Sequence, residues 1–290
     1  MNQQRTGDLY ALSCAVICGL GNITAKAGLE FLTTELFNFY MFLFAFVISS
    51  FSLINREQRR EIFDLNFRSF GLIFFLTLLF TSGIYFSLAA LKMIEPATAS
   101  FLSRMEVVVL VILAYIFLKE RLTKLEILGG VIALGGVFVL KYQTTLVISK
   151  AATLMIISAC FFAAAEILAK KNIDKIGIFR FIFYRNLITT FLMLFLLWGK
   201  NQTIYLPPGN ILTMTLLTAI FFPVLGRYTY LQAMKRIDIS RAAFVTQSTP
   251  LFTALFAFMI LQSLPTATEW LGGAIIIVGV IIVKLSKQKK

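Results

Sequence analysis

Glu126-Ile-Leu-Gly-Gly-Val-Ile and Glu269-Trp-Leu-Gly-Gly-Ala-Ile lie 143 residues apart and agree at five of seven positions. Working outward at the same spacing, residues 83–141 align with residues 226–284 without a gap and share 19 of 59 positions. Glycines and charged residues stay in register, which two unrelated apolar segments would not maintain. The sequence therefore predicts an internal duplication, and such a repeat constrains every later inference about the fold.

The composition assigns the chain to the membrane. Its 290 residues are 59% apolar and only 14% charged, and the mean hydropathy is +0.85. Soluble proteins are about half apolar and about a quarter charged. A soluble chain of this length could not bury so much apolar surface. We expect an all-α integral membrane protein.

Residue content also excludes several kinds of site. The chain has no His, which removes His-based catalysis and imidazole metal ligands. Its three cysteines, Cys14, Cys18 and Cys160, all lie in apolar runs, where small buried residues are expected rather than disulfides or zinc ligands. No phosphate-binding loop is present, so the chain does not drive transport with ATP. We predict a protein that is not an enzyme and holds no cofactor.

Ten windows are long and apolar enough to cross a bilayer, and the connections between them are short. The longest polar stretch, Asn55–Arg68, has room for a surface helix only. The windows are Leu9–Ala27, Leu36–Leu53, Phe70–Leu91, Ala97–Leu118, Leu125–Leu140, Ala151–Leu168, Ile176–Trp198, Ile211–Tyr230, Ala242–Leu261 and Trp270–Leu285.

The distribution of Lys and Arg predicts the orientation. With both termini in the cytoplasm, 19 of these residues fall in cytoplasmic segments and 4 in outer loops. This asymmetry is the positive-inside pattern, and it explains most of the net charge of +13 without a nucleic-acid partner. We expect a multi-pass protein of the cytoplasmic membrane.

Ten windows and one duplication predict two five-helix repeats, residues 1–145 and residues 146–290. A shift of 144 extends the duplication, since Ala25-Lys26 meets Ala169-Lys170 and Phe39-Tyr40 meets Phe183-Tyr184. Because five is odd, the second repeat must enter the membrane with the opposite orientation. Inverted repeats are typical of secondary transporters, which bind substrate near the midplane between the repeats. Duplication for stability alone is the alternative.

Longer motifs place the chain near a known family. Ser82-Gly-Ile-Tyr-Phe-Ser-Leu-Ala-Ala-Leu, Phe101-Leu-Ser-Arg-Met-Glu and Gly129-Gly-Val-Ile-Ala-Leu-Gly-Gly-Val in the first repeat resemble the EamA repeat of the drug/metabolite transporter superfamily. Phe183-Tyr-Arg-Asn-Leu and Trp270-Leu-Gly-Gly carry the resemblance in the second. It covers nearly the whole chain and implies ten helices and the export or exchange of small metabolites.

Charged side chains inside the predicted spans are the candidate site, because each would be costly facing lipid. Glu166 and Arg185 lie at similar depths, so either a structural ion pair or a substrate site is expected there. Arg227 and Lys26 lie nearer helix ends, where snorkelling is the alternative. Polar residues complete the set, although Tyr in a membrane is often an interfacial anchor. The candidate substrate-binding residues are Arg104, Glu106, Glu166, Arg185, Arg227, Asn22, Tyr85, Tyr228, Gln247 and Thr249.

These candidates predict the substrate chemistry. Arg stays protonated in almost any setting, so Arg104 and Arg185 are persistent positive charges, of which one can pair with Glu166. A substrate with an anionic group would relieve the cost of the other, which favours a zwitterionic amino acid or a related metabolite. Glu106 would bind a cationic group or carry a proton.

The expected partners are a small-molecule substrate and the lipid bilayer. The glycine-rich fifth and tenth windows favour close internal helix packing, and a homodimer interface is the weaker interpretation. A membrane channel and a lipid or small-molecule flippase remain the alternative functions.

Overall fold

The computed structural model describes the chain over residues 3–106, 108–109, 124–142, 146–170, 172, 176–237, 242, 245–246, 248–262 and 266–287. Within these ranges the fold is helical throughout, with no strand. The elements are α1 (Gln3–Leu29), α2 (Thr34–Ser50), η1 (Phe51–Ile54), α3 (Arg56–Phe63), α4 (Phe67–Met93), α5 (Pro96–Ser103), α7 (Lys124–Tyr142), α8 (Leu146–Lys170), α10 (Ile178–Gly199), α11 (Gly209–Ala219), η2 (Ile220–Gly226), α12 (Arg227–Met234), α14 (Thr249–Phe256), η3 (Ala257–Leu261) and α15 (Ala267–Lys287).

Six helical segments in the described part of the chain are long and apolar enough to cross a membrane. They are Gln4–Leu29, Thr34–Ile54, Phe67–Met93, Lys150–Ala169, Ile178–Gly199 and Gly209–Met234, and each matches one predicted window. Shorter apolar helices occupy Ile127–Gly136, Thr249–Leu261 and Trp270–Gly279, inside three other windows. Residues 107 and 110–118 of the window Ala97–Leu118 lie outside the described residues. The structure therefore confirms a helical protein with several spans, whereas ten spans remain an expectation.

Short polar side chains begin the helices of the first third of the chain. The side chain of Thr33 accepts a hydrogen bond from Leu36 N at the start of α2, and Asn66 accepts one from Ser69 N at the start of α4. Each satisfies a backbone donor that a helix N-terminus leaves unpaired. Asn55 caps α3 in the same way, so the polar stretch predicted to form a surface helix does so.

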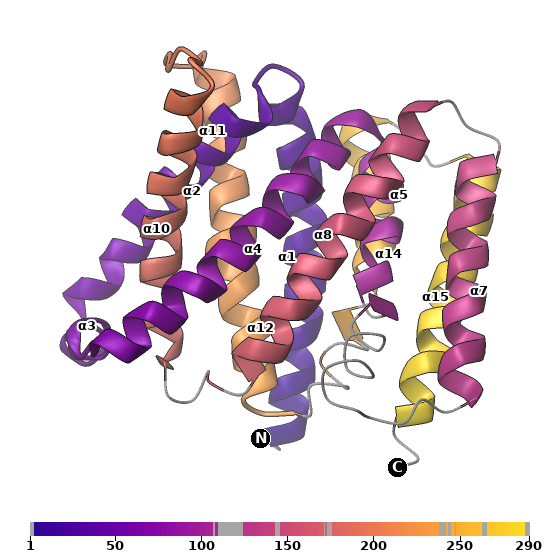
Figure 1. Cartoon of the computed structure of the whole chain (residues 1–290), viewed down its shortest axis with the longest axis horizontal. Helices are drawn as coiled ribbons and strands as arrows, with labels where there is room; N and C mark the ends of the chain where they lie inside the picture. Colours follow the sequence, from indigo (N-terminus) through magenta and orange to yellow (C-terminus); the bar gives the residue numbers. More distant parts are fainter. Residues whose placement is uncertain are drawn as a thin grey trace.

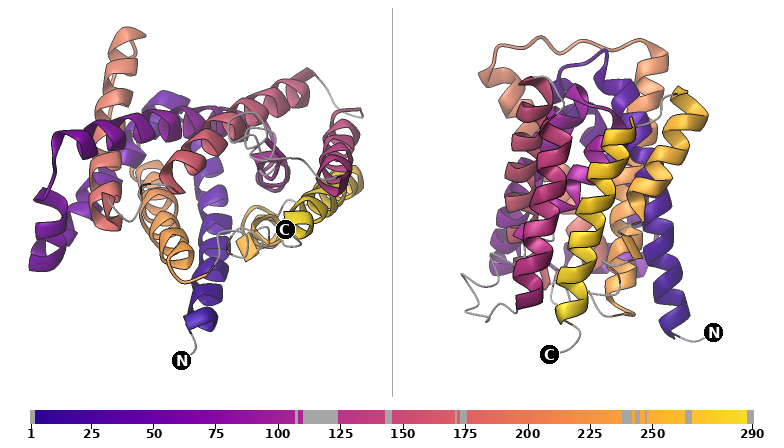
Figure 2. Two further views of the ribbon diagram at one scale, coloured as in Figure 1. Left: turned by 60° about the horizontal axis from the view of Figure 1, so that its bottom comes forward. Right: turned by 90° about the vertical axis from the view of Figure 1, so that its right-hand side faces the viewer.

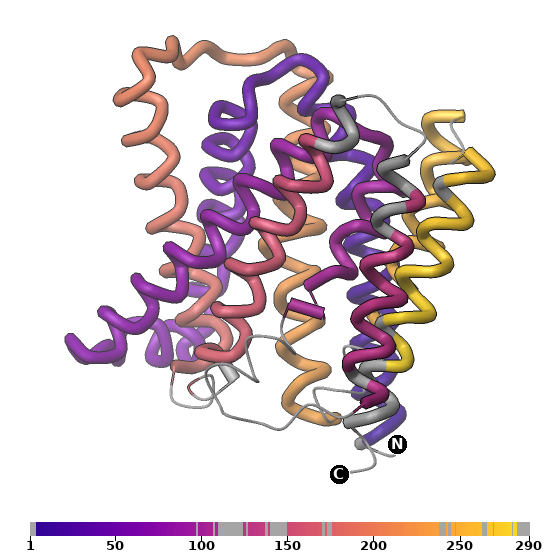
Figure 3. Tube along the Cα trace, turned by 45° about the vertical axis from the view of Figure 1, so that its right-hand side comes forward, coloured from indigo at the N-terminus to yellow at the C-terminus, as the bar shows by residue number. Residues whose placement is uncertain are grey.

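Three pairs of helices and a group around α1 build the body of the molecule. α7 packs along α15, α2 along α10, and α4 along α8, while α1 packs against α11, η2, α12 and α14. Figures 1 and 3 show the α2–α10 pair and the α7–α15 pair at opposite ends of the molecule, with α1, α4, α8 and α12 between them. The bottom view in Figure 2 shows the same order, with α1 near the centre. The start of α1 and the end of α15 lie on one side.

Glycines bring α7 and α15 together. A Cβ atom at Gly136 would lie 2.7 Å from both Gly272 O and Ile276 N, and one at Gly279 would lie 2.5 Å from Ala133 N and Gly129 O. Real Cβ atoms do not approach backbone so closely, so only glycine permits this contact. The predicted internal packing of the two glycine-rich helices is confirmed for these residues.

Candidate functional site: a cavity lined by both halves of the chain

A cavity of about 320 Å³ lies among the central helices. Its lining comes from α1, α2, α4 and α5 in the first half of the chain and from α8, α10, η2, α12 and α14 in the second. Phenylalanines form much of the apolar wall. The polar and charged lining residues are Cys14, Cys18, Asn22, Ser87, Ser100, Ser103, Arg104, Glu106, Ser158, Glu166, Arg185, Arg227, Tyr230, Thr246 and Thr249.

Most of the predicted site residues meet at this cavity. Asn22, Arg104, Glu106, Glu166, Arg185, Arg227 and Thr249 all line it. Tyr85 and Tyr228 do not belong to the lining, and Gln247 lies outside the described residues. Five charged residues from distant parts of the sequence therefore meet at one cavity. They were predicted because a charge is costly inside a membrane.

Glu166 forms its ion pair with Arg227, not with Arg185. The Glu166 Oε1 atom lies 2.9 Å from Arg227 Nη1, and both side chains are nearly buried. The expectation that Arg185 or Arg104 would pair with Glu166 is therefore wrong. The alternative that Arg227 snorkels is wrong as well, because its guanidinium faces the cavity. The depth of these residues in the membrane could not identify the partner of Glu166. α8 packs against α4, and the rotation of α8 that turns Glu166 toward α12 is not specified by the sequence.

Arg185 stabilises an irregular helix. Its Nη2 donates to Pro223 O at 2.7 Å and to Asn186 Oδ1 at 3.2 Å. Pro223 lies inside the π-helical segment η2, where it has no N–H to donate and the regular hydrogen-bond ladder is interrupted. Arg185 therefore satisfies a carbonyl that this interruption exposes, and η2 leads directly into Arg227.

Arg104 follows the last residue of α5, a short helix that begins with Pro96 at a position where proline is favoured. Its Nη1 donates to Thr246 O at 3.0 Å, and its Nε and Nη2 both donate to Ser103 Oγ. All three guanidinium nitrogens of Arg104 thus have partners, which come from α5 and from the segment before α14. Glu106, two residues further on, lines the same cavity.

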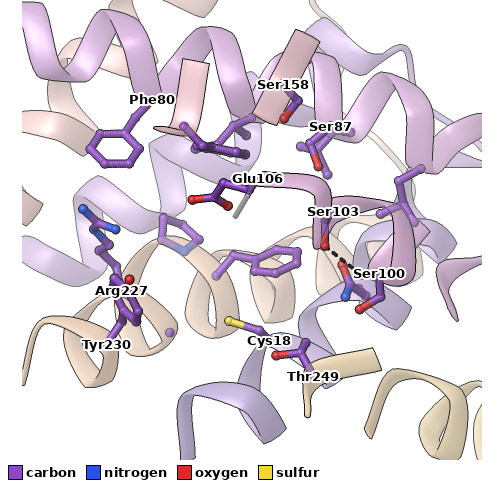
Figure 4. Close-up of a pocket in the computed structure, with 18 of the residues that line it drawn as sticks. Cys18, Phe80, Ser87, Ser100, Ser103, Glu106, Ser158, Arg227, Tyr230 and Thr249 are labelled. Atoms are coloured by element: carbon purple, nitrogen blue, oxygen red, sulfur yellow. Dashed lines mark hydrogen bonds between the residues drawn. The ribbon is translucent and has the colours of Figure 1, made fainter. Parts of the chain in front are cut away.

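Hydroxyl and amide groups join α1, α5 and α14 at another part of the cavity. Asn22 Nδ2 donates to Thr253 Oγ1 at 3.2 Å, and Thr253 Oγ1 donates to Ser100 Oγ at 3.4 Å. In Figure 4, Arg227, Phe80 and Tyr230 lie at one end of the cavity, Glu106 lies between, and Ser100 and Ser103 lie toward the other end. The cavity thus has one end with Arg227 and aromatic rings and another end with hydroxyl groups, where Arg104 also donates to Ser103.

The comparison with known families also divides the chain into a first and a second half. The sequence model of the EamA-like transporter family matches twice, over residues 5–142 and 149–285. The chain belongs to the EamA-like transporter family.

Two individual proteins are similar to this chain. An uncharacterized transporter of Synechocystis sp. is 24% identical over 225 residues, which cover 72% of this chain and 64% of that protein. The chain thus spans a little under two thirds of the length of this relative. A solved crystal structure shares the fold with a TM-score of 0.69 at 15% identity, covering 99% of this chain and 100% of the other.

The predicted tyrosines lie outside the cavity lining. Tyr85 donates to Glu35 Oε1 at 2.7 Å, and Lys200 forms an ion pair with the same carboxylate. The hydrogen bond to Glu35 raises the pKa of the Lys200 ammonium, and Tyr85 adds to that shift. This cluster joins α2, α4 and the end of α10. Tyr228 instead packs against Phe179, with ring centroids 5.8 Å apart.

Lys26 is a helix cap rather than a snorkelling side chain. Its Nζ donates to the carbonyl oxygens of Leu91, Lys92 and Ile94 at 3.0–3.3 Å. Carbonyls at the end of a helix lack partners within the helix, so the ammonium satisfies those at the end of α4. Lys26 therefore has a structural role between α1 and α4.

Sequence reasoning missed several cavity residues. Cys14 and Cys18 were expected to be small buried residues, yet both line the cavity, and Cys14 is also largely buried. Their spacing could have shown this, since Cys14, Cys18 and Asn22 recur every four residues on one face of α1. Tyr230 lies three residues after Arg227 and shares its face. Ser87 and Ser158 gave no comparable signal.

Proposed function

We propose that the protein is a secondary transporter that exports or exchanges a small polar metabolite by alternating access. One observation carries this proposal: a single cavity with five charged side chains is lined by residues from both halves of the chain. A site between two halves can be exposed to either side of the membrane when one half moves against the other.

The proposed architecture is ten transmembrane helices in two inverted repeats, residues 1–145 and 146–290. The two family matches, over residues 5–142 and 149–285, support this division. The packing also supports it, because helices related by the shift of 143–144 residues contact one another: α2 with α10, and α7 with α15. The contact of α1 with α12 corresponds to that of α8 with α4. In Figure 1, α1 runs upward while its counterpart α8 runs downward.

The cavity supports a small, polar substrate. A volume of about 320 Å³ is at the lower end of the range of about 300–1,000 Å³ for small-molecule sites. Such a cavity holds a molecule of amino-acid size and excludes a phospholipid, which argues against a lipid flippase. Charged groups on several helices can compensate a charged substrate in an apolar environment.

The proposed location is the cytoplasmic membrane, with both termini in the cytoplasm and the lipid bilayer as the surrounding partner. Nineteen Lys and Arg residues in one set of connections against four in the other support this orientation. The same asymmetry makes the Glu35–Lys200–Tyr85 cluster part of the outer side and α3 part of the cytoplasmic side.

Counterflow in proteoliposomes tests the proposal. Vesicles loaded with a candidate metabolite and diluted into a trace of the labelled compound should accumulate label transiently, and uptake should saturate. An alternating-access transporter exchanges labelled for unlabelled substrate, whereas a channel dissipates the gradient without exchange. Flux that rises linearly with concentration and shows no counterflow, across a broad metabolite panel, would contradict the proposal in favour of a channel.

A further inference from the structure

Arg227 lines the cavity and has an unused hydrogen-bonding edge. Its Nη1 donates to Glu166, but its Nε and Nη2 are buried and have no hydrogen-bond partner among the described residues. The Arg227 side chain is 10% exposed, so bulk water does not solvate it freely. Nε and Nη2 together form the side-on edge of a guanidinium, the edge that binds a carboxylate through two parallel hydrogen bonds.

Aromatic rings surround this guanidinium but cannot satisfy its edge. The Arg227 Cζ atom lies 4.4 Å from the ring centroid of Phe80, 5.5 Å from that of Phe181 and 5.7 Å from that of Tyr230. Cation–π contacts stabilise the charge and orient the plane of the group. Hydrogen-bond donors in that plane still need acceptors, and leaving charged donors unpaired in a buried place is costly.

The other cavity arginines are used differently. Arg104 directs all three guanidinium nitrogens to Thr246 O or Ser103 Oγ, and Arg185 holds Pro223 O and Asn186 Oδ1. Arg185 uses Nη2 for both of these hydrogen bonds, so its side-on Nε–Nη2 edge is not free. Among the arginines of the described cavity lining, Arg227 is thus the one whose whole side-on edge is unpaired.

Only the second repeat has an arginine at this position. η2 ends at Gly226, so the π-helical segment fixes the direction in which Arg227 leaves it, and π-helical segments are frequent at functional sites. The repeat shift pairs Arg227 with Ile84, Tyr230 with Ser87 and Glu166 with Asn22, all of which line the cavity. The first repeat therefore has uncharged residues at the positions that correspond to Arg227 and Glu166.

We propose that the Nε–Nη2 edge of Arg227 binds the carboxylate of the transported molecule, and that Glu166 is a positioning residue that fixes the opposite side of the guanidinium. The described cavity lining holds three arginines and two glutamates, an excess of one positive charge that a single carboxylate neutralises. A phosphate monoester carries close to two negative charges and would need more donors than this edge supplies. The substrate class is therefore a small monocarboxylate, amino acids included. This inference rests on the proposed function, since it names the substrate class of the same cavity.

Ligand binding to the purified protein in detergent tests the assignment without transport. Three matched pools serve as probes: the common L-amino acids, the corresponding amino-acid amides, and the corresponding carboxylic acids without the amino group. A fourth probe is O-phosphoethanolamine. Thermal stabilisation should require the carboxylate, so the first pool should raise the melting temperature and the amide pool should not. Stabilisation by the amides or by O-phosphoethanolamine alone, or no response to either carboxylate pool, would overturn the assignment.

Variants of the pair then locate the binding group. Arg227→Lys keeps the charge and loses the bidentate edge, and should weaken binding of the responding pool by about ten- to a hundredfold. Glu166→Gln should weaken binding less, because the edge itself remains. Since Arg227→Gln leaves Glu166 unpaired, the double variant Arg227→Gln/Glu166→Gln removes both charges of the pair. It leaves the net charge of the cavity unchanged and should fold while losing the response.

A control separates this effect from a general loss of positive charge. Arg236→Gln changes an arginine near the end of the same helical segment, whose Nη1 donates to Gln232 O and whose Cζ lies 4.7 Å from the Tyr10 ring centroid. It should bind the carboxylate pool as the unchanged protein does. If the double variant folds and still responds to the carboxylate pool, the assignment is wrong. If the carboxylate response depends on Arg227 but counterflow fails, the proposed transport mode is wrong and the anion site stands.

Discussion

Alanine at two adjacent glycines of α7 should have opposite effects on stability. Gly135 and Gly136 share the same helix and the same substitution, but they face different surroundings. No atom lies within 4 Å of a Cβ added at Gly135, whereas a Cβ at Gly136 would lie 2.7 Å from two backbone atoms of α15. Backbone atoms cannot move aside as the end of a side chain can, so α7 and α15 must separate to accept Gly136→Ala.

The expected difference can be worked out from these contacts. Either substitution gains up to about 1 kcal/mol, because glycine is a poorer helix former than alanine. Overpacking a closely packed interface costs about 1–3 kcal/mol, and only Gly136→Ala incurs it. The helix term is common to both variants and cancels, so Gly136→Ala should be less stable than Gly135→Ala by about 1–3 kcal/mol.

Thermal unfolding in detergent, followed by the loss of the monodisperse peak on size-exclusion chromatography, measures this difference. At roughly 2–4 °C for each kcal/mol, the two variants should differ by several degrees. Gly279→Ala, whose Cβ would lie 2.5 Å from Ala133 N and Gly129 O, should behave like Gly136→Ala. Equal melting temperatures for Gly135→Ala and Gly136→Ala would show that α7 does not pack on α15 through this face.

Three further predictions concern orientation and the cavity. Cysteine introduced at Gln202 should react with an impermeant maleimide added outside intact cells, and cysteine at Gln58, in α3, should not; the reverse labelling would contradict the proposed orientation. Glu106→Gln should reach the membrane normally but lose the pH dependence of transport between about pH 5 and 8, because a mid-membrane acid is expected to bind a cationic group or carry a proton; an unchanged pH profile would leave Glu106 a structural role. With Cys14 and Cys160 replaced by alanine, Cys18 should be the remaining thiol and should react with a small maleimide through the cavity that it lines. A transported compound should slow that reaction at least severalfold, and an unchanged labelling rate at saturating concentration would place the substrate elsewhere.

Local patterns in the sequence predicted much of the fold. Each of the six long spans coincides with one apolar window, because about 20 apolar residues are needed wherever a helix crosses a bilayer. The paired glycines of the fifth and tenth windows predicted close packing for a similarly local reason, since a missing Cβ permits backbone contact in any partner. Membership of the EamA-like family was expected from short motifs and confirmed over both halves.

The site was predicted in composition but not in connectivity. Burial of charge in a membrane is expensive at any angle around a helix, so the sequence alone could select Arg104, Glu106, Glu166, Arg185 and Arg227 as inward-facing. Which of them meet depends on how far each helix is rotated and where its regular hydrogen bonding breaks. A π-helical segment breaks the 3.6-residue periodicity of an α-helix, so counting residues no longer tells which face a later residue occupies. η2 is such a segment and lies directly before Arg227.

The sequence by itself therefore determined a helical membrane protein with an internal duplication and a set of charges that had to face inward, because each of these follows from transfer free energies that act residue by residue. Only the tertiary structure decided that Glu166 pairs with Arg227, that Arg185 supports Pro223, and that Tyr85 joins Glu35 and Lys200 outside the cavity. The Arg185–Pro223 and Glu166–Arg227 contacts join residues 38 and 61 positions apart through distances of about 3 Å, and Glu35 and Lys200 are 165 positions apart. Helix crossing angles and one irregular turn set such distances, and neither is encoded in the local pattern of apolar and polar residues.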